Sequence, residues 1–484
     1  MLYPFDHPHA DDPTPIVGGK GRSLWAMTGM GLPVPPGFTL PIGGDWSMDE
    51  IKAGLERVGA ALGRRFGDPL APLLVSVRSG AAQSMPGMMD TVLNVGLTEA
   101  TAAGLAQMTG NPAFAQDSYQ RFLHQFATTV LGLETEATTI DALYPLIRAG
   151  IGADTDDAYA LLERTISAVY ASWNSDRAKH YRKTVGLLDE GGTAVTVQAM
   201  VFGNLNDQSG TGVVFSRDPR TGEPGSTGDY LANAQGEAVV AGQAATVPYV
   251  NLVAAHPEID AALENHLKAL ESYYSDMVDV EFTIEDGKLW ILQARVGKRT
   301  PEAAARIAVD MEAEGALPRE AALSRIPDNY FSRDAVREAS GADALTTGLG
   351  ASPGLATGAI VLDPMDAIDR AEDGSVILVR QETSPADIHG MSVASGILTT
   401  LGGQMSHAAV VARSWSLPAV VGAADVQIGD GQIMINGRTF AEGETLTLDG
   451  GTGAVFAGER SGEAVADPVR EIIEQWKKEV EEAV

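Results

Sequence analysis

One histidine of this chain stands in a segment whose residue types suit phosphoryl chemistry. The segment LGGQMSHAAVVARSW (401–415) has two glycines that would end a strand, Ser406 as an N-cap, and then residues with helical propensity. His407 would occupy the first helical position, where the positive end of the helix dipole favours the neutral, nucleophilic imidazole. Free backbone N–H groups there could also bind a phosphate carried by the ring. The residues alone leave open a capped surface histidine without a chemical role.

Two cations near the N-terminus could bind phosphate groups from rigid supports. Lys20 follows two glycines in VGGKGRSLWAM (17–27), and Arg78 follows the apolar run LLVSV (73–77), which predicts a buried strand. Phosphoryl transfer depends on cations aligned with the phosphate oxygens, so both residues are candidate phosphate ligands. The Gly- and Met-rich loop at 79–88 could close backbone N–H groups over a nucleotide, with its methionines as a cover or as core filling. Each cation alone could also be a solvated surface charge.

A hairpin expected at 278–296 carries two polar side chains on each strand: Asp279, Glu281, Gln293 and Arg295. Residues two apart on a strand share a face, so the four line one site only if position 279 opposes 293 and 281 opposes 291. That register requires a three-residue loop at 285–287 with Gly287 in the left-handed conformation, and we predict this loop. A two-residue Asp-Gly turn would place the two pairs on opposite faces.

This hairpin could hold a divalent cation beside phosphate groups. In the predicted register Glu281 and Gln293 offer oxygen ligands, and Mg²⁺ prefers carboxylates together with phosphate oxygens. Arg295 would neutralise charge on a transferring phosphate. Taken alone, two acids and an arginine on a hairpin can also form a salt-bridged surface.

The elements that must position these residues fall into two parts joined by a tether. Short apolar runs with Gly and Pro fill residues 15–110, helical spacing follows to 184, and β patterns return from 193. A second part alternates short strands with polar turns. We therefore predict a mixed α+β and α/β multidomain protein with a first domain at 1–325 (helical subdomain 112–190), a linker at 326–350, a second domain at 351–460 and a terminal amphipathic helix at 461–484.

The C-terminal segment predicts a capped helix with one apolar face. Asp467 would be the N-cap and Pro468 would lie in the first turn. Five apolar residues would fall on one face: Val469, Ile472, Ile473, Trp476 and Val480. Such a face could dock another subunit or form a homodimer.

The composition excludes several classes of function. The 484 residues include 64 acidic and 34 basic side chains, which gives a formal net charge of −30. This charge argues against a general nucleic-acid-binding protein, because phosphate contacts need a basic face. The absence of cysteine excludes disulfides, thiolate metal sites and cysteine nucleophiles. The start does not read as a signal peptide and no run is apolar enough to span a membrane, so we expect a soluble cytoplasmic protein.

Several segments resemble, in order, the motifs of the pyruvate phosphate dikinase family. GGQMSHAAVVAR, with ETSPADIHGM before it and SLPAVVG after it, is similar to the phosphohistidine motif of phosphoenolpyruvate-utilising enzymes. The similar segments in the first domain are VGGKGRSLWAM, SVRSGAAQSMPGMMDT, VQAMVFGN, SGTGVVFSRDPRTGE, NAQGE and DVEFTIEDGKLWILQARVGKRT. The resemblance implies an ATP-grasp nucleotide-binding domain followed by a swivelling phosphohistidine β/α domain.

The resemblance also implies a role for each candidate residue. The implied catalytic residues are His407, Arg78 and Arg295. The residues implied to bind the nucleotide are Lys20, Arg78, Met200, Thr211, Gly212, Glu237, Asp279, Glu281, Gln293 and Arg295, of which Glu281 and Gln293 would also bind Mg²⁺. Backbone groups of the strand that ends at Met200 would meet the purine, and Glu237 would meet the ribose. Thr211 and Gly212 would approach the phosphates.

The reaction that the resemblance implies is transfer from ATP, with inorganic phosphate, to give a phosphohistidine at His407. Pyruvate would then accept the phosphoryl group on a phosphoenolpyruvate/pyruvate-binding (β/α)₈ barrel. Because such a barrel takes about 250 residues, we expect it on a separate chain. Two alternatives stay open: a small-molecule phosphotransferase with another acceptor, and a non-catalytic ATP-binding phosphocarrier or regulatory protein.

Two residues beside the histidine depart from the family pattern. Met405 stands where the dikinases usually have Thr, which implies that any regulatory phosphorylation at that position is lost. Leu401 stands where they usually have Arg, which implies a changed docking surface. Both lie at the end of the domain that would meet the acceptor.

Overall fold

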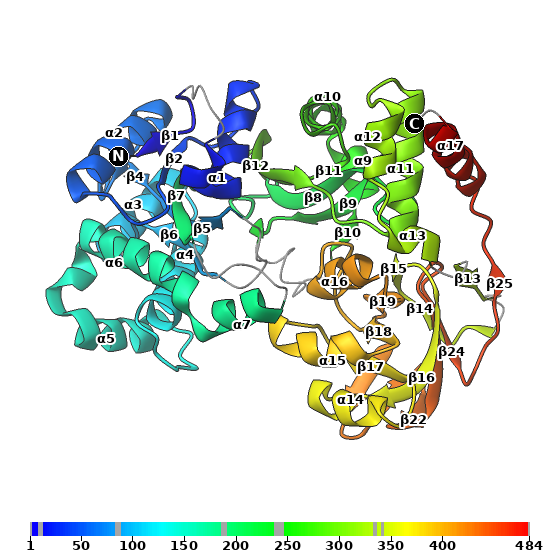
Figure 1. Ribbon diagram of the computed structural model, residues 1–484. Coiled ribbons are helices and arrows are strands. Elements are labelled where there is room, and N and C mark those ends of the chain that lie inside the picture. Colours follow the sequence, from blue (N-terminus) through cyan, green and yellow to red (C-terminus); the bar gives the residue numbers. More distant parts are fainter. Residues whose placement is uncertain are drawn as a thin grey trace. The chain divides into compact units, whose positions relative to one another are not determined.

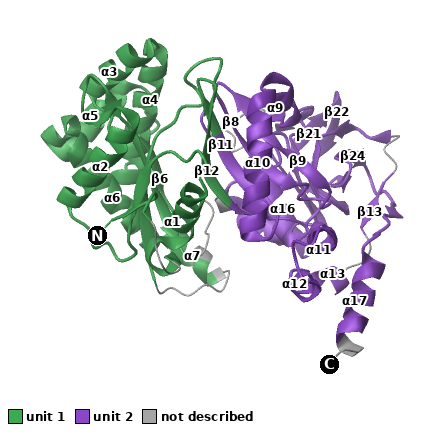
Figure 2. Cartoon of the chain, turned by 90° about the horizontal axis from the view of Figure 1, so that it is seen from above, with its two compact units in different colours: residues 1–209, 283–294 green, residues 210–282, 295–484 purple. Residues whose placement is uncertain are grey.

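The computed structural model describes residues 2–7, 13–82, 89–184, 191–236, 246–332, 336–339 and 343–482 (Figure 1). They form two compact units, drawn in green and purple in Figure 2. Unit 1 comprises Met1–Ser209 with Thr283–Ala294, and unit 2 comprises Gly210–Phe282 with Arg295–Val484. Both units combine sheets with helices, so the predicted mixed α/β multidomain fold is confirmed. Glu237 and most of the loop at 79–88, including Met85 and Met88, lie outside the described residues.

An antiparallel sheet forms the centre of unit 1. Its strands run in the order β1 (Tyr3–Pro4), β2 (Gly37–Leu40), β7 (Thr193–Ala199), β5 (Val75–Ala81) and β6 (Thr91–Val95). Every neighbouring pair is antiparallel. The apolar run before Arg78 predicts a buried strand, and Val75 and Val77 are fully buried in β5. A short parallel pair, β3 (Arg65–Phe66) and β4 (Pro72–Leu73), precedes this strand.

The helices of unit 1 form two groups along the sequence. Two precede β5: α1 (Thr14–Gly29) and α2 (Met48–Leu62). Those between β6 and β7 are α3 (Glu99–Thr109), α4 (Pro112–Gln125), α5 (Ile140–Ile151), α6 (Ala158–Ala171) and α7 (Asp176–Thr184). The stretch predicted to be helical therefore is helical. Phe122 and Ile166 of this stretch belong to the same hydrophobic core as Val75, so the helices share one core with the sheet.

The first part of unit 2, which we call the β8 lobe (210–282 and 295–332), is built on a second sheet. Its order is β10 (Val247–Pro248), β9 (Pro224–Ala232), β8 (Gly210–Arg217), β11 (Val278–Glu285) and β12 (Lys288–Val296), and the tip of the last hairpin is grouped with unit 1. The helices of this lobe are α9 (Val250–Ala255), α10 (Pro257–Tyr274), α11 (Pro301–Ala313), α12 (Arg319–Ser324) and α13 (Asn329–Ser332).

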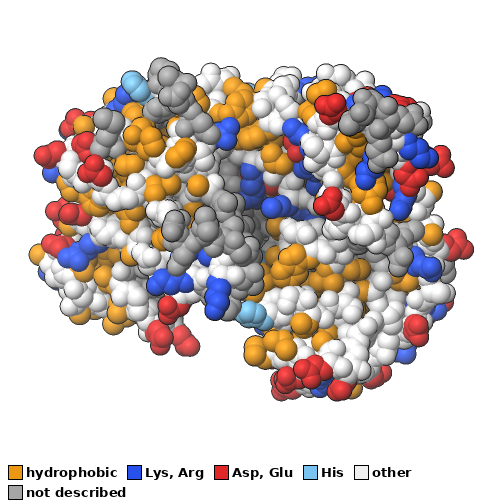
Figure 3. Space-filling model, in the orientation of Figure 1, with side chains coloured by type: hydrophobic (Ala, Val, Ile, Leu, Met, Phe, Trp, Pro, Cys, Tyr) orange, Lys and Arg blue, Asp and Glu red, His pale blue; other side chains and the backbone are white. Residues whose placement is uncertain are grey.

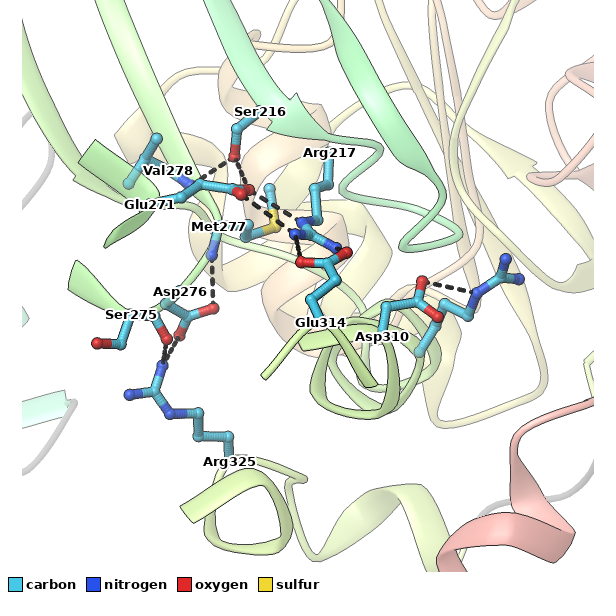
Figure 4. A network of polar contacts seen from close by, with 11 residues as sticks. Ser216, Arg217, Glu271, Ser275, Asp276, Met277, Val278, Asp310, Glu314 and Arg325 are labelled. Carbon is cyan, nitrogen blue, oxygen red and sulfur yellow. Dashed lines mark hydrogen bonds and ion pairs between the residues drawn. The ribbon is translucent and has the colours of Figure 1, made fainter. Parts of the chain in front are cut away.

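A buried arginine ties the β8 lobe together. Arg217, at the end of β8, contacts Glu271 of α10 (Nε–Oε1 3.0 Å) and Glu314 after α11 (Nη2–Oε2 2.7 Å), as Figure 4 shows. Its side chain is only 6% exposed, so water solvates the guanidinium poorly. The two carboxylates compensate this loss of solvation. Glu271 also accepts a hydrogen bond from Ser216 (2.6 Å), which in turn accepts one from the Val278 amide at the start of β11. The network therefore fixes the strand that carries Asp279.

The second part of unit 2, which we call the histidine lobe (343–464), contains the eight-stranded sheet β14-β24-β23-β16-β17-β18-β19-β15. The strand bounds are β14 (Thr346–Thr347), β15 (Leu349–Ser352), β16 (Leu355–Val361), β17 (Val376–Arg380), β18 (Gly396–Thr399), β19 (Ala419–Val421), β23 (Thr445–Asp449) and β24 (Ala454–Ala457). The four strands from β16 to β19 are parallel. The connecting helices are α14 (Pro364–Ala371), α15 (Ile388–Val393) and α16 (His407–Trp415).

The histidine lobe also has a small second sheet, and two short strands flank the lobe. The second sheet contains β20 (Val426–Gly429), β21 (Gln432–Ile435) and β22 (Arg438–Ala441). The flanking strands, β13 (Arg337–Glu338) and β25 (Glu463–Ala464), pair antiparallel with each other. Because β14 and β15 belong to the large sheet, this sheet begins inside the stretch that the sequence predicts to be a linker.

The terminal helix α17 (Arg470–Glu482) packs on the β8 lobe. Val469, Ile473 and Trp476 are buried in a cluster with residues of α11 and α12, as the apolar pattern predicts. Ile472, however, is 40% exposed and lies outside this buried contact. Adjacent positions on a helix point about 100° apart, and the narrow contact takes only Ile473 of the pair. The Asp467 carboxylate contacts the Val469 amide (3.3 Å) and the Tyr330 hydroxyl (2.6 Å).

Acidic side chains are spread over the surface of the structure, and the described helices do not meet the requirements for a membrane span. On the face drawn in Figure 3, acidic side chains occur at many places on both units. Among the helices that the structure describes, none has the length and apolar character needed to cross a bilayer.

Candidate active site

His407 is the first residue of α16, as the sequence predicts. Ser406 caps this helix: its hydroxyl oxygen accepts a hydrogen bond from the Ala409 amide (3.4 Å) and donates one to the Gly403 carbonyl (2.9 Å). The backbone N–H groups of the first helical turn therefore point toward the end of the helix where the imidazole lies. This arrangement gives the ring the local field that favours a neutral nucleophile and an anionic product.

A threonine holds one nitrogen of the imidazole. The Thr383 hydroxyl lies 3.1 Å from Nδ1 of His407, and Thr383 is only 6% exposed. Thr383 follows the carboxyl end of β17 and His407 follows that of β18, and these parallel neighbours bring the two side chains together. If Nδ1–H donates to the hydroxyl, Nε2 keeps its lone pair and is the candidate nucleophile.

The surroundings of the ring favour its neutral form. Burial lowers the pKa of the His407 imidazole below its ordinary value, while the negative charge of nearby Asp387 opposes that change. A neutral ring is the form with a free lone pair, so lowering the pKa extends the nucleophilic state to more acid pH.

Two cations of unit 1 lie at one face of its sheet. Arg78 and Gly80 are two apart on β5, so they share a face. A Cβ built on Gly80 would lie 3.3 Å from the Cβ of Lys20 in α1, which places Lys20 on that same face. The structure thus brings the predicted phosphate ligands Lys20 and Arg78 together. Met200 is buried, and its amide donates to the Leu74 carbonyl (2.9 Å), so only its carbonyl is left to meet a purine.

Arg295 forms an ion pair with the buried carboxylate of Asp279 in unit 2. The distance between Arg295 Nε and Asp279 Oδ1 is 2.8 Å, and the Asp279 side chain is 2% exposed. Burial raises the pKa of Asp279 to about 6, against the lowering effect of Arg295. Burial alone would lower the pKa of Arg295, but the charges of Asp279 and Glu281 outweigh it and raise the pKa. A guanidinium that stays charged among carboxylates can face a phosphate that carries several negative charges.

The predicted three-residue hairpin loop is wrong. β11 ends at Glu285 and β12 begins at Lys288, so the loop has only Asp286 and Gly287, with φ values of 50° and 75°. Positive φ at both residues defines a type I′ turn, whose twist matches that of the strands and which Asp-Gly favours. Hydrogen bonds from Asn206 to Asp286 (2.8 Å) and from the Asp286 amide to Ser209 (2.9 Å) hold this turn.

With the shorter loop, the four predicted side chains differ in their contacts and in the unit to which they belong. Arg295 contacts Asp279, with Nε 2.9 Å from Oδ2. Glu281 belongs to unit 2 and Gln293 to unit 1, so their joint role as magnesium ligands stays a prediction. Within the residues that the structure describes, no group of three or more His, Asp or Glu side chains is placed to hold a metal.

Thr211 and Gly212 lie inside strand β8 and not in a turn. The Thr211 hydroxyl donates to the Phe282 carbonyl (3.0 Å), and the residue is 2% exposed. A Cβ on Gly212 would come within 2.6 Å of the Phe282 ring, so packing against β11 already requires glycine there. The approach of Thr211 and Gly212 to phosphate groups stays a prediction.

A buried glutamine beside Thr211 was not singled out by the sequence. Gln235 of the NAQGE segment is 7% exposed, and neither its amide oxygen nor its amide nitrogen has a hydrogen-bond partner among the described residues. A Cβ on the next residue, Gly236, would lie 3.4 Å from the Thr211 hydroxyl. Leaving a buried amide unpaired is costly, which makes Gln235 a candidate ligand for a bound molecule.

The segment before His407 contacts the β8 lobe within unit 2. The Met405 amide donates to Asp229 Oδ2 (3.2 Å), and the Gln404 amide nitrogen lies 3.1 Å from the Thr227 hydroxyl. A Cβ on Gly403 would lie only 2.3 Å from Asp229 Oδ2, so the approach requires glycine. Met405 is buried in a cluster with Phe215. We call this set the docking contact.

A buried arginine of α16 completes the docking contact. Arg413 is 1% exposed, donates to the Gln404 carbonyl (2.6 Å), and lies over the Phe215 ring at 5.5 Å. Burial lowers its pKa to about 10, although the charges of Asp279, Asp218 and Asp229 oppose this change. Its Nε and Nη1 have no hydrogen-bond partner among the described residues. This burial could not be predicted from the local pattern, because an arginine near a helix C-terminus is usually solvated.

Comparison with protein families assigns both parts of the chain. The AMP/ATP-binding domain of pyruvate phosphate dikinase matches residues 46–256 and 256–316, which is more than half of the chain. The mobile domain of phosphoenolpyruvate-utilising enzymes matches residues 372–453, which include His407. The chain belongs to the pyruvate phosphate dikinase family. The predicted resemblance is thereby confirmed, and the family's mobile domain is the histidine lobe described above.

Curated dikinases align with nearly the whole chain. "Pyruvate, phosphate dikinase 2" of Oryza sativa subsp. japonica is 43% identical over 491 residues, covering 92% of this chain and 55% of that protein. The "Pyruvate, phosphate dikinase" of Giardia intestinalis is 43% identical and that of Rhizobium meliloti (strain 1021) is 41% identical, each over 92% of this chain and 56% of the relative. The chain thus spans about half the length of these dikinases.

Proposed function

We propose that this protein uses ATP to phosphorylate His407, as the ATP half-reaction of a pyruvate phosphate dikinase. The observation that carries the proposal is the histidine at the N-terminus of α16, with Nδ1 against Thr383 and Nε2 left as the nucleophile. Membership of the dikinase family supports ATP as the donor. The cytoplasm is the proposed location, since it supplies ATP and inorganic phosphate.

The first step would be attack of Nε2 on the β-phosphorus of ATP. A bond forms between Nε2 and phosphorus, and AMP leaves with the bridging oxygen and its electron pair, so the ring carries a pyrophosphoryl group. Inorganic phosphate would then take the terminal phosphoryl group as pyrophosphate and leave phosphohistidine. Because such transfers depend on positioned positive charge, Lys20, Arg78 and Arg295 are proposed to bind the phosphate oxygens.

Magnesium is part of this proposal as a partner of the nucleotide. Glu281 offers a carboxylate beside Asp279 and Arg295, and Gln293 offers an amide oxygen, which are ligand types that Mg²⁺ accepts together with phosphate oxygens. When bound, the cation would neutralise charge on the phosphate groups. Glu237, outside the described residues, is proposed to meet the ribose, and Thr211, Gly212 and the Met200 carbonyl to meet phosphate and purine.

Pyruvate is the proposed final acceptor, and it needs a phosphoenolpyruvate/pyruvate-binding barrel. We propose that such a barrel, as a separate subunit, receives the phosphoryl group from His407. The relatives named above are about twice the length of the matched region, which supports a second functional part in the complete reaction. Mixing phosphorylated protein with an isolated dikinase barrel and pyruvate should release the label as phosphoenolpyruvate.

Two radioactive forms of ATP test the ATP half-reaction. ATP labelled at the β-phosphorus should label His407 and keep the label after inorganic phosphate is added, with one AMP formed per site. ATP labelled at the γ-phosphorus should lose its label as pyrophosphate at that point. His407→Ala should abolish both signals, whereas His389→Ala, a change at an exposed histidine of α15, should leave them intact. Stable labelling of the His407→Ala protein at another residue would rule the proposal out.

A further inference from the structure

The turn that carries Thr383 is closed by one carboxylate. Asp387 Oδ2 accepts hydrogen bonds from the Ser384 amide (2.6 Å) and the Ser384 hydroxyl (3.0 Å), and the Ser384 hydroxyl accepts one from the Ala386 amide (3.2 Å). This is a capping box around the short helical turn at 385–387. Thr383 directly precedes the box, so the carboxylate fixes the threonine that contacts His407 Nδ1.

The charge of this carboxylate is only partly compensated. Asp387 is 7% exposed, so water screens it little. Its nearest cation is Arg380, whose Nη2 lies 3.6 Å from Oδ1, beyond hydrogen-bond distance. The other guanidinium end, Nη1, donates to the Leu362 carbonyl (3.0 Å). The carboxylate is therefore paired with a cation at some distance, and it lies on the turn that carries Thr383.

Few other charged groups face the ring. The strands packed on α16 are β15, β18 and β19, and within their bounds they carry no titratable side chain. On the approach from β17 and α15 the titratable residues are Arg380, Glu382, Asp387 and His389. From the β8 lobe, Asp229 contacts the Met405 amide, two residues before the histidine, and Arg413 lies at the other end of α16. Among these groups, the charge of Asp387 acts on His407.

We infer that Asp387 is a positioning residue for His407: it holds the Thr383 turn and opposes the positive charge that the ring gains when Nε2 becomes phosphorylated. The inference rests on the proposed function for its second part. In the neutral ring the proton lies on Nδ1, against Thr383. When the Nε2–phosphorus bond forms and AMP leaves with the electron pair, that proton stays on Nδ1 and the ring becomes a cation. A fixed carboxylate nearby lowers the free energy of this cation.

The Asp387→Asn variant isolates the charge, because an asparagine amide oxygen can still accept from the Ser384 amide. A nearby carboxylate raises the pKa of an imidazole, so its loss should lower the pKa of His407 by about half a unit or more. This pKa is measured by NMR titration of the histidine-labelled protein, with His407→Gln to assign the signal. The maximal rate of labelling by β-labelled ATP should fall about tenfold or more, with the KM for ATP unchanged.

Two control variants separate charge from capping. Asp363 caps α14 of the same lobe by accepting from the Met365 amide (2.7 Å), and Asp363→Asn should leave both the His407 pKa and the labelling rate unchanged. Ser384→Ala removes one hydrogen bond to Asp387 but keeps the charge, so it should also leave the His407 pKa unchanged. Ser384→Ala keeps the test available if Asp387→Asn does not fold, because a lowered His407 pKa in this variant would overturn the charge role.

The two measurements distinguish failure of this inference from failure of the proposed function. An unchanged His407 pKa in a folded Asp387→Asn protein overturns the inference, even if labelling falls. Equal effects of Asp363→Asn and Asp387→Asn also overturn it, because they indicate general destabilisation. If the wild-type protein takes no label but the pKa falls as expected, the proposed function fails and the electrostatic role of Asp387 stands.

Discussion

Thr383 contacts one nitrogen of His407 and leaves the other without this contact. The contact between the hydroxyl and Nδ1 is buried, so it competes with little water and holds the ring in one orientation. A surface histidine would exchange freely between tautomers and orientations. Thr383 therefore fixes the orientation of a histidine at the first position of α16.

Replacing Thr383 by Val should slow the labelling of His407 by about 10- to 100-fold, because one hydrogen bond to a group that becomes charged is lost. Valine has nearly the same shape, so the melting temperature should change little. Rapid-quench labelling with β-labelled ATP measures the rate, and Thr383→Ser, which keeps the hydroxyl, should recover most of it. A Thr383→Val protein that labels at the wild-type rate would show that Nδ1 needs no fixed partner.

Gln235 presents the opposite situation, a buried polar group with no partner among the described residues. If its amide binds the nucleotide, Gln235→Leu should weaken ATP binding by about tenfold, a loss of about 1.4 kcal/mol. The same change should raise the melting temperature of the nucleotide-free protein, because an unpaired buried amide costs about 1–3 kcal/mol.

Calorimetric titration and thermal unfolding test these two effects of Gln235→Leu. Gln427→Leu, at an exposed strand position of the histidine lobe, is the matched control and should change neither quantity. A lower melting temperature in Gln235→Leu without nucleotide would mean that the amide already has a partner. Unchanged ATP affinity would remove Gln235 from the nucleotide site.

At the scale of elements, the docking contact joins α16 and its preceding loop to strands β8 and β9. Its members are complementary in shape at Gly403, in hydrogen bonding at Asp229, and in charge at Arg413. An arginine with two unpaired nitrogens is stable there only while the surrounding carboxylates stay close. The contact therefore has strict geometric limits.

Gly403→Ala should open the docking contact, because a Cβ would lie 2.3 Å from Asp229 Oδ2 and 2.7 Å from Thr246 Oγ1. Overpacking of this kind costs about 1–3 kcal/mol, enough to shift a balanced equilibrium between docked and undocked lobes. Hydrogen exchange measured by mass spectrometry should speed up in peptides that contain 403–413 and 227–231. Gly374→Ala, where a Cβ meets nothing within 4 Å, is the matched control. Unchanged exchange in Gly403→Ala would show that the loop adapts without undocking.

Element types and the position of His407 could be predicted from the sequence, because local signals determine both. Ser406 followed by small helix-forming residues is enough to place the start of α16. The predicted hairpin loop is wrong because it was chosen to place four side chains on one face. The dipeptide Asp-Gly strongly favours a type I′ turn, and this preference determines the loop. In that case local turn chemistry decided the backbone.

Contacts between distant segments could not be predicted in this way. Thr383 meets His407 because β17 and β18 are parallel neighbours, and this pairing has no local signal in either segment. Arg413 and Gln235 are buried by strands from other parts of the chain. In the C-terminal helix, the helical pattern indicates which apolar residues share a face but not how much of that face another element covers, and Ile472 is 40% exposed.

At the scale of the whole molecule, the β13–β25 pair has a mechanical consequence. Arg337–Glu338 leads toward the histidine lobe and Glu463–Ala464 leads away from it, and the two strands are hydrogen-bonded side by side. Because the segments that enter and leave the histidine lobe are paired with each other, the lobe can rotate about this pair without stretching either segment. If the two segments left from opposite ends of the lobe, a rotation would stretch one of them. A rotation of the histidine lobe about this strand pair would therefore move His407 along an arc whose radius is the distance from the pair to the imidazole.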